Sequence, residues 1–326
     1  MTSTDLSPVH PPFDPELAAA LAVAEDVPTT VTPDMLAALR SGAAASAPSL
    51  TAIAGEYGVD VRTVTVARAD APDLRLLVAC PPDTRPGSPA LYWIHGGGVV
   101  LGDFRFGIDL VLPWAVELGV PVVSVDYRLA PAHPDPAAVE DCYAGLVWVA
   151  GHAAELGVDP SRLVLAGHSA GAGLAAGTAL LARDRSGPRA VGQLLLCPML
   201  DDREQTPASR QLDGVGVWDR TANRTAWEAR LGARRGGPAV EPYSAPARAT
   251  DLSGLPPTFV DVGSVDTFRD EAVGYATRIW EAGGVAELHV WPGAYHCFEI
   301  LAPTAAVSVA AVERRTHWLR RVLRPA

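Results

Sequence analysis

The pattern of apolar and polar residues changes near residue 60 of the chain. Before that point, helical periodicity appears at Pro15–Ala24 and at Pro33–Arg40, where Thr32 is expected to cap the helix and Pro33 to open it. After it, short apolar runs predict eight strands: Val61–Ala67, Leu74–Pro81, Ala90–His95, Val120–Asp126, Leu163–Gly167, Val191–Pro198, Thr258–Gly263 and Ala286–Trp291.

From about residue 90, these strands alternate with helical stretches. The predicted helices are Ile108–Leu118, Pro136–Leu156, Ala170–Arg183, Arg269–Ala282 and Thr304–Leu323. Alternation of strands and helices is typical of an α/β fold with right-handed crossovers. Several later strands are continuous apolar runs, which indicates a parallel sheet covered on both faces. The first two strands alternate more and are compatible with an antiparallel edge.

Two segments stand apart from this rhythm. Residues 1–55 are rich in alanine and proline, and residues 201–237 are charged and rich in arginine and glycine around Trp218 and Trp227. The second segment is predicted to be an insertion over the sheet. The remaining residues, 56–200 and 238–326, are expected to form one α/β core that carries the catalytic residues.

Charge and composition exclude several classes of function. The net charge is −11 and the basic residues form no block, which disfavours a nucleic-acid partner. All 26 basic residues are arginine. The absence of lysine excludes Schiff-base chemistry, a P-loop lysine and a Ser-Lys dyad within this chain, so an activated serine needs a histidine as its base.

The four cysteines, Cys80, Cys142, Cys197 and Cys297, are widely spaced in the sequence, without a C-x-x-C pair or a His-Cys metal spacing. They are interpreted as small buried hydrophobic residues in a reducing compartment. The N-terminal residues lack the features of a signal peptide, and no apolar run reaches about 18 residues. The sequence therefore predicts a cytoplasmic protein without a membrane span, a metal or an organic cofactor.

A strand-to-helix turn carries the clearest chemical motif. Residues 167–171 read Gly-His-Ser-Ala-Gly after an apolar strand, which matches the G-x-S-x-G nucleophile elbow. In such an elbow the residues two before and two after the serine must be very small, and the serine is held in a strained backbone conformation. This predicts Ser169 as a nucleophile.

A hydrolytic serine also needs donors for a developing oxyanion. Gly96, Gly97 and Gly98 follow His95 directly after a predicted strand. Consecutive glycines allow backbone N–H groups to turn toward a ligand, because no Cβ obstructs them. This loop is therefore the candidate oxyanion trap.

The base is sought C-terminal to the serine, among His289, His296 and His317. His289 falls within a strand and His317 within the last helix, whereas His296 follows a strand at the edge where α/β active sites collect. For the orienting acid, Asp261 lies in a strand and Asp270 opens a helix. Asp266 lies in the loop between them and is predicted to accept a hydrogen bond from His296.

An alternative motif overlaps the elbow. Gly171–Ala176 fits the dinucleotide pattern G-x-G-x-x-A, but the glycines begin after Ser169, and no acidic residue ends a strand about 20 residues later. The dinucleotide interpretation is therefore rejected.

Five segments taken together resemble the hormone-sensitive lipase family of esterases, also called family IV. They are His95–Gly98, Asp126–Pro134, Gly167–Gly171, Gly263–Ala276 and Tyr295–Phe298, in the expected order. The resemblance implies an α/β-hydrolase fold with about eight strands, and a helical cap built from residues 1–55 and 201–237. It implies Ser169, His296 and Asp266 as the triad and the amides of Gly97, Gly98 and Ala170 as oxyanion donors. His95 and Asp126–Pro134 would brace the oxyanion loop.

Three residues depart from that family pattern. The family usually has Asp or Thr at position 168, often an aromatic residue at 99 and commonly glycine at 297, where this chain has His168, Val99 and Cys297. The departures leave acyl-chain preference and subfamily open, because none removes a catalytic atom.

The sequence therefore predicts a carboxylesterase that acts on small short-chain esters through an acyl-enzyme. Amide, formamide or carbamate hydrolysis and acyl transfer remain open on the same residues. A ligand-binding receptor, as some proteins similar to this family are, is disfavoured because all three triad residues are present. The sequence also leaves a homodimer open.

Overall fold

A computed structural model describes residues 9–24 and 27–324. The first eight residues, for which the sequence predicts no signal peptide, lie outside these ranges. The described chain contains an eight-stranded sheet in the order β1-β2-β4-β3-β5-β6-β7-β8. The strands are β1 Asp60–Val66, β2 Leu74–Cys80, β3 Ser88–Ile94, β4 Val122–Asp126, β5 Val158–His168, β6 Gly192–Leu196, β7 Thr258–Val265 and β8 Ala286–Tyr295.

Strand directions follow the expected pattern. β2 pairs antiparallel with both β1 and β4, and the other five neighbouring pairs are parallel. The prediction of a mostly parallel α/β sheet with an antiparallel edge is confirmed. The structure extends β5 and β8 beyond the predicted runs, so that β5 reaches His168 and β8 reaches Tyr295.

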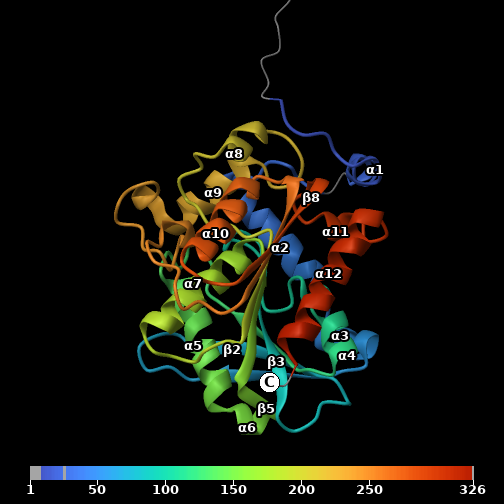
Figure 1. Cartoon of the computed structure of the whole chain (residues 1–326), viewed down its shortest axis with the longest axis vertical. Coiled ribbons are helices and arrows are strands. Elements are labelled where there is room, and N and C mark those ends of the chain that lie inside the picture. The colour runs from blue at the N-terminus through green and yellow to red at the C-terminus, as the bar shows by residue number, and fades with distance from the viewer. Residues whose placement is uncertain (1–8, 25–26, 325–326) are drawn as a thin grey trace, which may run out of the picture.

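Helices cover both faces of the sheet (Figure 1). They are α1 Pro15–Val23, α2 Leu36–Ser46, α3 Leu50–Tyr57, α4 Leu112–Leu118, α5 Ala137–Gly151, α6 Ala153–Leu156, α7 Ala170–Asp184, α8 Pro207–Gln211, α9 Arg220–Leu231, α10 Arg269–Glu281, α11 Phe298–Leu301 and α12 Ala306–Val322. In the described residues, no helix combines the length and apolar character needed to cross a membrane.

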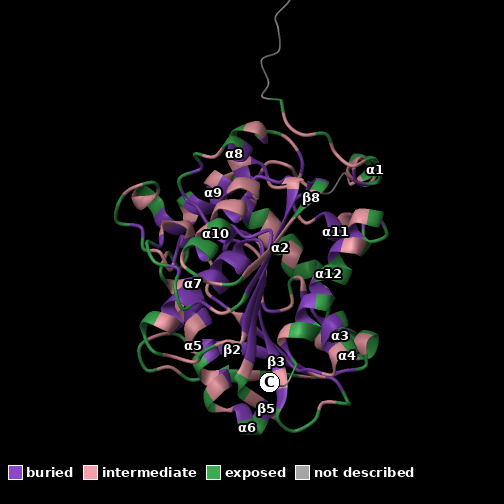
Figure 2. Ribbon diagram, viewed as in Figure 1, coloured by how far each residue is buried: buried purple, intermediate pink, exposed green. Residues whose placement is uncertain are grey.

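The core alternates between the two faces with the period of a strand. In β3, Tyr92 and Ile94 belong to the hydrophobic cluster beneath α5, α7 and α10, whereas Leu91 and Trp93 belong to the cluster on the other face. Figure 2 shows the sheet as a buried layer between the helices on its two faces. Burial on both faces explains why the central strands read as continuous apolar runs.

Several predicted helices differ in detail from the structure. Thr32 makes no side-chain cap, because its hydroxyl donates to Asp34 Oδ1 at 2.6 Å, and Pro33–Met35 form a 3-10 turn before α2 begins. The single helix predicted over Pro136–Leu156 is divided at His152 into α5 and α6. Residues 108–118 likewise form a 3-10 turn followed by α4.

The structure adds α3, which the sequence pattern did not reveal. Ile53 is buried in the same cluster as Leu77 and Trp93, so this helix packs on the sheet. The boundary expected near residue 55 therefore falls inside a helix of the α/β core.

The N-terminal residues and the 201–237 segment contact each other. The Asp219 N–H donates to the carbonyl of Thr29 at 3.0 Å, and the Thr30 hydroxyl donates to Asp219 Oδ2 at 2.5 Å. The Asp219 side chain also caps α9 through the Ala222 N–H. In Figure 1, α8 and α9 lie at the upper end of the molecule, above α7 and β5.

Candidate active site

Ser169 lies in the sharp turn between β5 and α7. Its backbone angles are φ 57° and ψ −123°, a conformation that a serine adopts only under strain. A Cβ on Gly167 would lie 2.4 Å from the carbonyl oxygen of Gly171, and one on Gly171 would lie 2.1 Å from the carbonyl oxygen of Ile94. Both glycines are therefore required by the close approach of backbone to backbone.

Replacement of Gly171 by alanine is expected to lower the free energy of unfolding by roughly 2–3 kcal/mol, because the new methyl group has only rigid backbone to displace. The midpoint of urea denaturation measures this loss. Gly274, within α10, is a matched control, since a Cβ there meets nothing within 4 Å. Gly274→Ala should be neutral or stabilising by up to about 1 kcal/mol. Equal midpoints for the two variants would contradict the expected role of Gly171.

The three residues predicted as a triad lie within hydrogen-bonding distance of one another. His296 Nε2 is 2.9 Å from Ser169 Oγ, and His296 Nδ1 is 2.9 Å from Asp266 Oδ2. The second carboxylate oxygen of Asp266 accepts from the Phe268 N–H at 2.8 Å, and the Phe268 ring meets the His296 ring edge-on. All of these side chains are buried, so the chain of hydrogen bonds is fixed in orientation.

The other acids weighed from the sequence are engaged elsewhere. Asp261 in β7 pairs with Arg315 at 2.7 Å and accepts from the indole N–H of Trp291. Asp270 accepts from the Ala208 N–H and pairs with Arg269.

The two other histidines that follow Ser169 also lie apart from the elbow. His289 pairs with Glu287 on β8, and His317 is exposed on α12. Neither is within hydrogen-bonding distance of Ser169 Oγ.

The pKa of His296 is set by its burial and by its neighbours, and the result suits a general base. Burial opposes charging of the ring, whereas the neighbouring Cys197 sulfur and the Asp266 carboxylate favour it, and the balance raises the pKa of His296 well above 6.5. Because burial also raises the pKa of the Cys197 thiol, that sulfur is uncharged at neutral pH. The Asp266 carboxylate is therefore the charged neighbour that raises the pKa of His296 by stabilising the imidazolium.

The glycine loop faces Ser169 with unused donors. Gly97 has φ 92° and Gly98 has φ 64°, both in the left-handed region that glycine tolerates. In the described part of the chain, neither glycine N–H donates a hydrogen bond to protein. Ala170 opens α7, where the first N–H groups lack intrahelical partners and the helix dipole is positive. These groups could bind a negatively charged oxygen.

Side chains from two distant segments brace this loop. The Tyr127 hydroxyl lies 2.8 Å from the carbonyl of His95 and 3.0 Å from that of Gly96, and its ring stacks on His95. Arg40 of α2 donates to the carbonyls of Val100 and Ala130. Sequence analysis missed Arg40, because nothing in a helical repeat indicates that one arginine turns inward.

A cavity of about 270 Å³ opens onto Ser169. Its wall is almost wholly apolar, and its residues come from five segments far apart in the chain: Val27, Pro28, Val31, Leu39, Gly97, Gly98, Leu101, Phe106, His168, Ser169, Val217, Trp218, His296, Cys297, Ile300 and Leu301. The Trp218 indole lies close against Gly98, where a Cβ would come within 2.6 Å of the ring. The cavity therefore suits a small apolar group attached to a reacting carbonyl.

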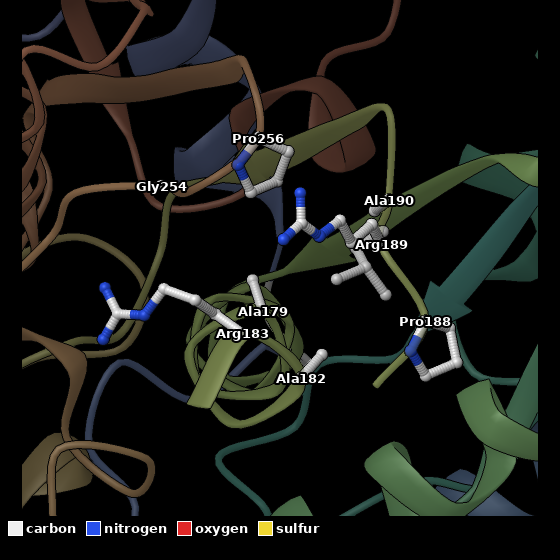
Figure 3. A pocket seen from close by; sticks show the side chains of 9 residues that line it. Ala179, Ala182, Arg183, Pro188, Arg189, Ala190, Gly254 and Pro256 are labelled. Carbon is white, nitrogen blue, oxygen red and sulfur yellow. The ribbon is translucent and has the colours of Figure 1, made fainter. Parts of the chain in front are cut away.

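A second cavity, of about 320 Å³, lies elsewhere (Figure 3). Ala179 and Ala182 of α7 line it, and at 1.5 Å per residue they are roughly 14–18 Å along the helix from the elbow. Arg183 at its rim donates to the carbonyls of Asp251 and Ser253. The residues lining this cavity include no serine, cysteine or histidine, so it offers no nucleophile or base.

The three departures from the family pattern lie around the elbow. Val99 has φ 63° and Cys297 has φ 61°, so two non-glycine residues are in left-handed backbone, at a cost of about 1–2 kcal/mol each. His168 Nε2 is 3.0 Å from the sulfur of Cys297. Burial raises the pKa of the Cys297 thiol, which makes it unsuited to act as a second nucleophile.

Two of the four cysteines, Cys197 and Cys297, lie close to His168, although their spacing in the sequence does not indicate it. The sulfurs of Cys197 and Cys297 and a ring nitrogen of His168 all lie within 4.8 Å of one another. Cys197 follows β6, His168 ends β5 and Cys297 follows β8, so this grouping arises at the carboxyl edge of the sheet. Local sequence spacing carries no signal for it.

The sheet, the strained serine and the hydrogen-bonded Ser169, His296 and Asp266 define a serine hydrolase of the α/β-hydrolase class. A family model described as alpha/beta hydrolase fold matches residues 91–300. The chain belongs to this family and, by its relatives, to the hormone-sensitive lipase-like esterases within it.

Relatives of known name support this placement. Carboxylesterase NlhH of Mycobacterium tuberculosis is 37% identical over 254 residues, which cover 75% of this chain and 79% of that protein. The solved structure of a bacterial heroin esterase is 38% identical, with a TM-score of 0.87 over 96% of this chain and 98% of that chain. Esterase LipW from Mycobacterium marinum is 34% identical, with a TM-score of 0.87 over 97% and 99% of the two chains.

Proposed function

We propose that this protein is a carboxylesterase in which Ser169 is the nucleophile, His296 the general base and Asp266 the residue that orients the base. One observation carries the proposal: a buried chain of hydrogen bonds from Asp266 through His296 to a strained serine at the floor of an apolar cavity. The amides of Gly97, Gly98 and Ala170 are proposed as the oxyanion donors.

The geometry supports a two-step reaction through an acyl-enzyme. His296 Nε2 accepts the Ser169 proton while Oγ attacks the ester carbonyl, and the same proton then passes to the leaving alcohol. Water, activated by His296, attacks the acyl-serine and releases the acid. Backbone amides hold the negative oxygen in both steps, and the loss of one such donor costs on the order of 3–4 kcal/mol of transition-state stabilisation.

Activity is expected to fall on the acid side through the protonation of His296. Only the neutral imidazole accepts the serine proton, so kcat/KM is high above the pKa of His296 and is lost as the pH falls through it. Because Asp266 raises that pKa, the acidic limb should be centred above pH 6.5. A pH profile of kcat/KM measures the midpoint, and a flat profile down to about pH 4 would contradict a histidine base.

The segments over the cavity and the volume of the cavity support a preference for small substrates. Residues 9–24, 27–46 and 201–237 are proposed to form the cap, since Val31 and Leu39 from the N-terminal part and Val217 and Trp218 from the second segment line the cavity. Together they limit its volume to about 270 Å³, just below the roughly 300–1,000 Å³ of most ligand sites. The proposed substrates are therefore esters with short acyl groups.

A panel of p-nitrophenyl esters from acetate to palmitate tests this preference. We expect kcat/KM to fall at least about tenfold from butyrate to palmitate, because the longer chain exceeds the cavity. Formamides and carbamates assayed beside them define the bond that is cleaved, and the same assays with Ser169→Ala give the uncatalysed background. Faster turnover of emulsified long-chain triglycerides than of butyrate esters would contradict the proposed substrate class.

The cellular location and the oligomeric state of the protein are also proposed, each from a single kind of observation. Cys80, Cys142, Cys197 and Cys297 are all free thiols, which supports a reducing, cytoplasmic location. β8 ends the sheet order, and Trp280 and Val285 beside it are exposed. These features support a homodimer in which β8 is covered by a second copy, a proposal that sedimentation velocity tests.

A further inference from the structure

We propose that His168, Cys197 and Cys297 form a binding site for a borderline-soft divalent cation such as Zn²⁺, and that the bound ion blocks the cavity beside Ser169. The proposal concerns a second ligand of the same cavity. Its binding experiments do not depend on whether the protein hydrolyses esters.

The donor set and its dimensions fit such an ion. Two thiols and one imidazole are ligands that zinc prefers, with Zn–S distances near 2.3 Å and Zn–N distances of about 2.0–2.1 Å. In a tetrahedral centre, these bond lengths separate neighbouring ligand atoms by about 3.5–3.8 Å. The three side-chain atoms already lie within 4.8 Å of one another, and His168 Nε2 is 3.0 Å from Cys297 Sγ. Small side-chain rotations would therefore supply three of the four ligands of a tetrahedral ion.

The fold holds these ligands on rigid elements. His168 is the last residue of β5, and Cys197 follows directly on β6, the neighbouring parallel strand. Cys297 follows His296, and its left-handed backbone turns the chain from β8 into α11. Strain that is retained in a non-glycine residue is typical of sites with a function.

The position of the cavity determines how the ion would reach the site and how it would affect substrate binding. His168 and Cys297 line it together with Ser169 and His296, whereas Cys197 lies behind them and is only 6% exposed. An ion entering from the cavity would keep one coordination position directed toward it. The ion and its water would occupy space required by the acyl group, and the ion would tie Cys297 to His168 and Cys197.

A second set of three possible ligands, which shares Cys197 with the first, could bind the same ion and must be distinguished from the proposed site. Cys197, Asp266 and His296 also present ligand atoms within 4.8 Å of one another. This grouping would require Asp266 and His296 to give up their mutual hydrogen bond, whereas the first grouping leaves that bond intact. The first grouping also supplies two sulfurs instead of one, which suits Zn²⁺ better.

Titration of the reduced, metal-free protein with Zn²⁺ and Co²⁺ tests the site. We expect one equivalent to bind, a Co²⁺ spectrum with visible tetrahedral bands and a thiolate charge-transfer band, and inhibition of ester hydrolysis that a chelator reverses. Cys197→Ser and Cys297→Ser should each weaken binding by at least about 10²-fold, because even loss of an outer-shell partner costs 10–100-fold. Cys80→Ser, a distant thiol, is the matched control and should bind and hydrolyse as the wild type does.

Three results would overturn the proposal: no stoichiometric binding, a Co²⁺ spectrum without a thiolate band, or binding that is lost in His296→Ala and retained in His168→Ala. Alkylation of the wild-type protein measures metal binding without any substitution, so misfolding of a variant does not affect the result. Zn²⁺ should protect Cys297 from maleimide, detected by peptide mass spectrometry, while Cys80 reacts equally with and without the ion. Equal labelling of Cys297 in both conditions would also contradict the site.

Discussion

Replacement of Ser169 by alanine is expected to lower kcat/KM for p-nitrophenyl butyrate by at least about 10⁴-fold. The Ser169 hydroxyl, whose oxygen lies 2.9 Å from His296 Nε2, is the group that would form the acyl-enzyme. Burial raises the pKa of the neighbouring Cys197 thiol, so this thiol is a poor substitute nucleophile. The residual rate would come from the amides of the glycine loop and from substrate binding. Steady-state kinetics and the burst of p-nitrophenol in the first turnover measure the effect.

Ser308→Ala is a suitable control for this experiment. Ser308 is fully buried in α12, and its hydroxyl has no hydrogen-bond partner among the described residues. Its removal should leave kcat/KM unchanged, because Ser308 does not line the cavity and makes no hydrogen bond to the residues that do. Wild-type activity in Ser169→Ala, with the same thermal stability, would show that another residue is the nucleophile.

Replacement of Asp266 by asparagine is expected to lower kcat by about 10⁴-fold while leaving the fold intact. The carboxylate accepts the Nδ1 proton of His296 and leaves Nε2 free to accept from Ser169. An amide in its place would stabilise the other tautomer of the imidazole, in which Nε2 carries the proton and cannot act as a base. It would also remove the negative charge that favours the imidazolium, so the remaining activity should show an acidic limb at lower pH.

Asp270→Asn is the matched control for Asp266→Asn. Both carboxylates lie near the start of α10, and both accept a backbone N–H, Asp266 from Phe268 and Asp270 from Ala208. The asparagine oxygen at 270 can still accept that hydrogen bond. We expect kcat to change less than about twofold, since surface substitutions away from a site have small effects. Similar losses in the two variants would contradict the assignment of Asp266 as the orienting acid.

Much of the fold could be predicted from local patterns. The period of two in strands and the steric demand of the elbow at Gly167 and Gly171 depend on residues close in the chain, so the sequence alone reveals them. His296 and Asp266 could be nominated for a related reason. In a parallel sheet the residues that follow each strand meet at one edge, and these two follow β8 and β7.

Contacts between distant segments were not predictable in the same way. Arg40 reaches the glycine loop because α2 crosses that end of the sheet, and its spacing in the helix carries no sign of this contact. The walls of the cavity combine Val31, Leu39 and Trp218, which are far apart in the sequence, and no local pattern indicates that they meet. Substrate size depends on these residues and therefore on packing.

The chain by itself determined the order of strands and helices, the strained serine and the residue types that could act on it, because each depends on backbone geometry over a few residues. Tertiary structure decided which of these side chains meet. The sheet register aligns the ends of β5, β6 and β8, and this alignment brings His168, Cys197 and Cys297 within 4.8 Å of one another although they are widely separated in sequence. The same alignment places His296 against Ser169, since distances across a sheet follow from strand pairing and not from sequence spacing.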